Sequence, residues 1–155
     1  MSTFSKWLYL IALIVWVGEM VFFSFVVAPA IFRVFPPADA GRAVGAIFPT
    51  YYGIGYACGL ILCVGSVVFW RTGAGRGAWM VNTCLAAVML AATLYAGRIV
   101  LPRATLLRPQ VVEPEVTPAA REEFQRLHRW AVNLNSLILS CGLAMSLITA
   151  ARLRP

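Results

Sequence analysis

Four long apolar stretches restrict this chain more than any other feature. They cover about residues 7–32, 51–70, 79–97 and 130–151, and a helix needs about 20 apolar residues to cross a bilayer. A membrane-spanning segment must satisfy its own backbone hydrogen bonds, which favours helices. Only 12% of the residues are charged, against about 25% in soluble domains. We therefore predict an all-α integral membrane protein, a four-helix up-down bundle formed by a single domain over residues 1–155.

Tryptophan positions predict how the helices alternate. Trp7, Trp70 and Trp79 fall at one membrane face and Trp130 at the other, and indole rings prefer the level of the headgroups. Both termini then lie on one side of the membrane, which we call side A. The two longer connections lie on the opposite side, side B.

The first of these connections, residues 33–50, is rich in proline. Pro36 and Pro37 should stop the first helix, because proline does not fit a helix interior. We expect a short interfacial helix from Asp39 to Phe48, ended by Pro49.

The second connection covers about residues 98–129. Pro109, Pro114 and Pro118 predict an extended first part, after which Thr117 and Pro118 can cap and start a polar helix. That helix leads directly into the fourth span. The fold class therefore includes short interfacial helices on side B.

The net charge of +7 comes mostly from arginines placed between the apolar stretches. This placement favours topology control and lipid headgroups as the role of the charges, and no nucleic-acid partner is expected. The compact basic loop near Arg71 and the short basic tail favour cytoplasmic termini. We expect a bacterial cytoplasmic (inner) membrane location, also because the chain is rich in Arg and poor in Lys. The first span could pass for a signal peptide, but its length and Glu19 favour a retained span.

Small residues and cysteines inside the spans have a packing interpretation. Gly55 and Gly59 form a small-x-x-x-small pair, and Gly142 repeats this spacing with Ser146. Such pairs let helices approach closely, either within this bundle or at an oligomer or partner interface. We interpret the four cysteines as small buried apolar residues, and the alternative is that Cys and Met side chains together form a path for a soft metal ion.

Glu19 is the most informative residue because it lies near the centre of the first span. It is about 18 Å along the helix from Trp7, and an acidic group at that depth costs roughly 2–3 kcal/mol. It either locks helix packing as a neutral, hydrogen-bonded group or binds a proton, cation or ligand.

Other polar residues of the spans gather in the side B half, whereas side A offers Asn82, Thr83 and little else. The candidates for a proton or ligand site are Glu19, Arg33, Tyr95, Arg98, His128, Asn133 and Asn135. We predict a polar pocket open to side B with Glu19 at its floor, while headgroup contacts and interhelical hydrogen bonds remain the alternative roles.

Several functions lack their residues. There is one histidine, which excludes bis-His haem in one chain. No hydrolase or P-loop motif is present. We expect a non-enzymatic protein without a cofactor that works as an oligomer or with another membrane protein. An electron-transfer subunit holding haem, a metal at His128, or a quinone is one alternative, and a pure scaffold is another.

Parts of the chain resemble the uncharacterised family typified by transmembrane protein 205. The resemblance lies in Trp16-Val17-Gly18, residues 22–33, residues 47–52, residues 95–102, and Phe124 through Leu127-His128 to Asn133 and Asn135. It implies four membrane helices and no defined enzyme activity. Eukaryotic relatives are linked to platinum-drug resistance and membrane traffic, with metal export through Cys and Met proposed. Here the cysteines lack shared-face spacing, which argues against that export route.

Overall fold

The computed structural model describes residues 3–72, 75–112 and 118–152, and every element in these ranges is helical. Four long helical stretches are apolar enough to cross a membrane, as predicted: Thr3–Val34, Pro37–Thr72, Arg76–Leu107 and Pro118–Arg152. They identify a multi-pass membrane protein in a lipid bilayer. The predicted cap at Thr117 and the break at Pro114 lie outside the described residues.

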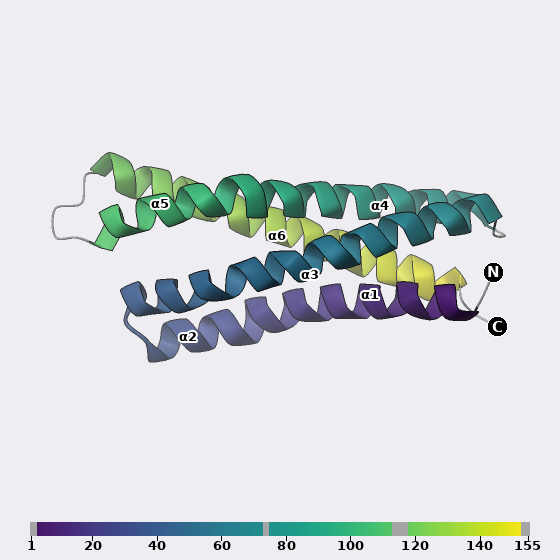
Figure 1. Cartoon of the computed structure of the whole chain (residues 1–155), viewed down its shortest axis with the longest axis horizontal. Coiled ribbons are helices and arrows are strands. Elements are labelled where there is room, and N and C mark those ends of the chain that lie inside the picture. The colour runs from purple at the N-terminus through teal and green to yellow at the C-terminus, as the bar shows by residue number, and fades with distance from the viewer. Residues whose placement is uncertain (1–2, 73–74, 113–117, 153–155) are drawn as a thin grey trace.

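Two of the long stretches each contain a π-helical turn. The elements in chain order are α1 (Thr3–Phe22), η1 (Phe23–Val27), α2 (Ala28–Val34), α3 (Pro37–Thr72), α4 (Arg76–Tyr95), η2 (Ala96–Val100), α5 (Leu101–Val112) and α6 (Pro118–Arg152). Figure 1 shows the start of α1, the end of α6 and the connection from α3 to α4 at one end of the molecule. We call this the side A end. The α2–α3 connection and α5 lie at the other, the side B end.

Large side chains fill the interior between the helices. Tyr9, Phe69 and Trp79 form an aromatic cluster near the side A end, with ring centroids 4.7–5.7 Å apart. Trp79 is buried, so it does not face the membrane surface as its position predicted. An indole this close to the first helix gains more from packing than from a place at the headgroups.

The three predicted packing glycines lie inside this one chain. A Cβ atom on Gly55 would lie 3.1 Å from Trp16 Nε1, and one on Gly59 would lie 3.0 Å from the same indole. A Cβ on Gly142 would lie 2.8 Å from Val17. The glycines therefore let α3 and α6 pack closely against α1.

Proline stops the helices at fewer places than predicted. The first stretch ends at Val34, before Pro36, as expected. The prediction of a separate short helix over residues 39–48 is wrong, because α3 runs unbroken through Pro49. The prediction of an extended segment after Arg98 is also wrong for the residues up to Val112, because η2 and α5 continue the helix there. Each proline removes one backbone hydrogen bond, and the packing of α3 on α2 and of α5 on α6 offsets that loss, so the helices continue.

The two π-helical turns have a common cause that the sequence reading missed. In each, an N–H bonds to a carbonyl five residues earlier, from Ala28 to Phe23 and from Leu101 to Ala96. The next residues are Pro29 and Pro102. A proline ring clashes with the carbonyl four residues before it, and the wider turn moves that carbonyl away. π-turns of this kind often occur at functional sites.

Candidate functional site

The bundle separates into two helical hairpins at its side B end. There α2 packs on the start of α3, and α5 packs on the start of α6. Across the described ranges, α2 makes no contact of comparable extent with α5 or α6, and Figure 1 shows the two pairs diverging. The place where they part is the candidate site.

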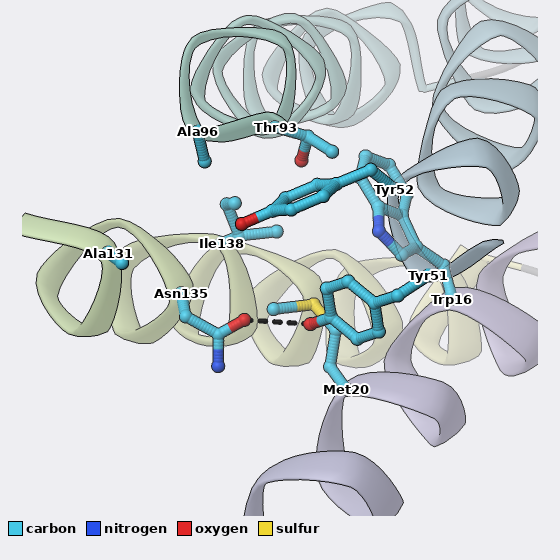
Figure 2. A pocket seen from close by; sticks show the side chains of 9 residues that line it. All are labelled: Trp16, Met20, Tyr51, Tyr52, Thr93, Ala96, Ala131, Asn135 and Ile138. Carbon is cyan, nitrogen blue, oxygen red and sulfur yellow. Dashed lines mark hydrogen bonds between the residues drawn. The ribbon is translucent and has the colours of Figure 1, made fainter. Parts of the chain in front are cut away.

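A small cavity lies at this junction. Its volume is ≈ 10 Å³, about the space that one water molecule needs. Figure 2 shows Tyr52 reaching from α3 into the space between α4 and α6, while Tyr51 lies beside Met20 of α1 and points toward Asn135 of α6. The lining residues are Trp16, Met20, Tyr51, Tyr52, Thr93, Ala96, Ala131, Asn135 and Ile138.

Three polar side chains beside the cavity form what we call the clasp: Tyr51, Asn135 and Ser24. The Tyr51 hydroxyl donates a hydrogen bond to Asn135 Oδ1 at 2.8 Å (Figure 2). Asn135 Nδ2 donates to Ser24 Oγ at 2.9 Å. The clasp therefore joins α3, α6 and η1, and the π-turn sets the position of Ser24 on η1.

Aromatic rings surround the clasp. Phe23 packs against Tyr51 with ring centroids 5.1 Å apart, and Tyr52 stacks with Tyr56 at 6.4 Å. Gly97 in η2 makes room for these tyrosines, since a Cβ there would lie 2.9 Å from the Tyr52 ring and would also collide with the Tyr56 hydroxyl. Rings packed this tightly hold the Tyr51 hydroxyl in place.

Glu19 lies on α1, one residue before Met20 of the cavity wall, and its side chain is half-buried. Its Oε2 atom is buried and has no hydrogen-bond partner among the residues that the structure describes. The carboxyl group is close enough to the Tyr51 hydroxyl and the Cys58 thiol to interact electrostatically with both. Glu19 is thus a carboxyl group beside the clasp, outside the cavity lining itself.

The structure brings together only part of the predicted cluster. Asn135 lines the cavity and Glu19 lies beside it. The Arg98 guanidinium lies 5.8 Å from the centre of the Tyr56 ring, on the exposed side of η2. The side chains that point away from the interior are Arg33, Tyr95, His128 and Asn133. Arg33 and His128 are exposed because α2 and the start of α6 leave the four-helix core, whereas Tyr95 at the end of α4 and Asn133 on α6 lie on the outward faces of their helices. Their role in binding a ligand stays a prediction.

A second polar cluster lies in the side A half, where the sequence indicated Asn82 but not its partners. Asn82 is fully buried, and its Nδ2 donates to Thr149 Oγ1 at 3.0 Å and to Tyr9 Oη at 3.3 Å. This cluster joins α1, α4 and α6. The amide at position 82 inside an apolar stretch was the available signal, but its two hydroxyl partners come from spans far away in sequence.

Metal-binding side chains are scattered. Residues 3–72, 75–112 and 118–152 hold no group of three or more His, Cys, Asp or Glu side chains that could bind a metal ion. The four cysteines are free thiols.

Comparison with known proteins places the chain in a family. Residues 11–113 match the family model described as a domain of unknown function (DUF4149). An uncharacterized protein of Aquifex aeolicus (strain VF5) is 40% identical over 55 residues, 36% of this chain. The match spans 38% of that relative's length. No solved structure matches. The matched residues include most of the first span, the second and third spans, both π-turns and Glu19, and the chain belongs to the family of domain of unknown function DUF4149.

Proposed function

We propose that this chain is a non-enzymatic membrane protein whose Glu19 binds a proton or a small cation inside the bilayer. In this proposal it works as an oligomer or as an accessory subunit of a larger membrane assembly. One observation carries the proposal: the Glu19 carboxyl group has a buried oxygen without a hydrogen-bond partner in the described part of the chain.

The physical reason for this proposal is that the hydrocarbon core of the membrane cannot solvate a charged carboxylate group. An ionised carboxylate without a partner is very costly in an apolar medium, and such groups neutralise or bind a counter-ion. A neutral carboxyl group that only locked helix packing would donate and accept hydrogen bonds, and Glu19 makes none within the ranges described. This favours exchange of a bound proton or cation over a structural role.

We also propose the placement in the membrane. The four helices cross in up-down order with cytoplasmic termini, in a bacterial inner membrane. The 36 residues of α3 extend about 54 Å, well beyond the hydrocarbon core of about 30 Å. The side B ends of the helices therefore project from the membrane as hairpins. The kinship with the family typified by transmembrane protein 205 belongs to this proposal, and the residues that support it are Pro29, Pro49, His128 and Asn135.

An apolar carbodiimide that reacts with protonated carboxyl groups tests the role of Glu19. In proteoliposomes, we expect dicyclohexylcarbodiimide to modify Glu19 at acid pH and less as the pH rises, because the carboxylate does not react. Mass spectrometry of the peptides measures the modified fraction. If sodium or lithium at constant pH protects Glu19 from modification, the site binds a cation. If neither ion protects Glu19, the site binds a proton.

The matched variants are Glu19→Gln, which must abolish the modification, and Asp39→Asn, which must not affect it, since Asp39 pairs with Arg42 at the start of α3. Labelling that is absent, or that does not depend on pH, contradicts the proposal.

The electron-transfer and scaffold alternatives stay predictions. The exposed position of His128 on α6 gives a haem or metal role no added support. An absorbance spectrum of protein purified from its own membranes tests that alternative, and a visible band would favour it.

A further inference from the structure

Polar groups are distributed unequally on the two sides of Glu19. Toward side B lie the clasp and the cavity, with the hydroxyl groups of Tyr51, Tyr52 and Thr93 and the amide of Asn135 around it. This is also where the two hairpins part. A hydrated path needs groups that can replace the hydrogen bonds of bulk water, and these residues supply them.

Toward side A the interior is closed by an apolar layer. Its members come from three helices and are fully buried: Leu62 on α3, Ala86 and Met89 on α4, and Met145 on α6. Met89 also reaches the neighbourhood of Gly142, since a Cβ there would lie 3.2 Å from its terminal methyl. The polar cluster of Tyr9, Asn82 and Thr149 lies beyond this layer. The two polar regions are thus separated by an apolar section.

We propose that Glu19 exchanges its proton only with the aqueous phase at side B, by water that enters between the hairpins and passes along the clasp. The inference rests on the proposed function, because it describes how the bound proton reaches Glu19. One proton passes from a hydronium ion to a carboxylate oxygen, which gives a neutral carboxylic acid and a water molecule, and the reverse step returns the proton to water and forms hydronium again. Tyr51, Asn135 and Ser24 keep their own protons and serve as the polar lining.

The surroundings of Glu19 fit this role. The titratable groups that interact with it are Tyr51 and Cys58 on α3. From η1 and α6 the clasp adds Ser24 and Asn135, which carry no charge. Arg98 lies over Tyr56, and among the described residues no basic side chain pairs with Glu19. The proton must therefore come from water.

The test changes the pH on one side of the membrane at a time. Full-length protein is reconstituted in liposomes, and its orientation is measured by protease cleavage of a terminal tag from outside. The infrared carbonyl band of the protonated carboxyl group, taken as the difference from Glu19→Gln, reports the state of Glu19. We expect the band to follow the pH at side B and to ignore the pH at side A.

Two conservative variants locate the path. Tyr51→Phe keeps the ring and removes the hydroxyl, and we expect exchange to slow by about fivefold, the effect of one lost hydrogen bond in the path. Tyr9→Phe is the same chemical change beyond the apolar layer, and it should leave the rate unchanged.

The outcomes separate the two proposals. If no band depends on Glu19, the proposed proton site itself is wrong. A band that responds equally to both sides, or to side A, overturns one-sided access while the site stands. Equal effects of Tyr51→Phe and Tyr9→Phe overturn the assignment of the path.

Discussion

At the scale of single residues, the site depends on how closely two helices approach at Gly97. The rings of Tyr52 and Tyr56 occupy the place of a side chain at this position. Because these rings belong to the aromatic group that holds Tyr51, a change at Gly97 acts on the clasp without touching it. Gly53 offers a contrast, because a Cβ there meets nothing within 4 Å.

We expect Gly97→Ala to destabilise the protein by about 1–3 kcal/mol, the usual effect of overpacking. Gly53→Ala should be neutral or slightly stabilising, because alanine favours a helix over glycine by about 1 kcal/mol. Thermal unfolding in detergent, followed by circular dichroism, compares the two. Equal midpoints for both variants would show that the tyrosine rings move aside freely.

At the scale of elements, prolines determine the local shape of the helices. Hydropathy predicted the four spans because each must be apolar over its whole crossing. The rule that proline ends a helix failed at Pro49 and Pro109, because each proline removes one backbone hydrogen bond and the packing of α3 on α2 and of α5 on α6 offsets that loss. Asn135 was found from the sequence as a polar residue in a span. Ser24 and Tyr9 were not, since their partners depend on a π-turn and on helix packing.

The π-turn at η1 makes a prediction for Pro29. Replacing Pro29 by Ala removes the ring that requires the wide turn, so η1 should return to α-helical register and carry Ser24 away from Asn135. In the natural sequence we expect Ser24→Ala to cost about 1 kcal/mol for the lost hydrogen bond. In the Pro29→Ala background it should cost almost nothing.

A double-mutant cycle of unfolding free energies measures this coupling. Pro49→Ala is the matched control, because Pro49 sits in continuous α-helix and its removal should leave the cost of Ser24→Ala unchanged. Additive effects of Pro29→Ala and Ser24→Ala would mean that the proline does not position the serine.

At the scale of the whole molecule, two polar regions are separated by the apolar layer of Leu62, Ala86, Met89 and Met145. The clasp ties η1, α3 and α6 toward side B, and Asn82 ties α1, α4 and α6 toward side A. Both regions involve α6 and the first span, which contributes Ser24 from η1 and Tyr9 from α1. The layer between them therefore has two roles in our proposal: it supplies packing energy, and it keeps water from joining the two polar regions.

Met89→Ala tests both roles at once. Removing a fully buried methionine side chain should cost about 2–5 kcal/mol through lost transfer energy and the cavity left behind. Met80→Ala on the same helix is the control, since Met80 is 47% exposed and should change stability by less than about 0.5 kcal/mol. If the layer also seals the path, the Glu19 carbonyl band of Met89→Ala should begin to follow the pH at side A. A variant that is destabilised as expected yet still responds to side B alone would show that the layer is packing only, and that the seal lies elsewhere along the bundle.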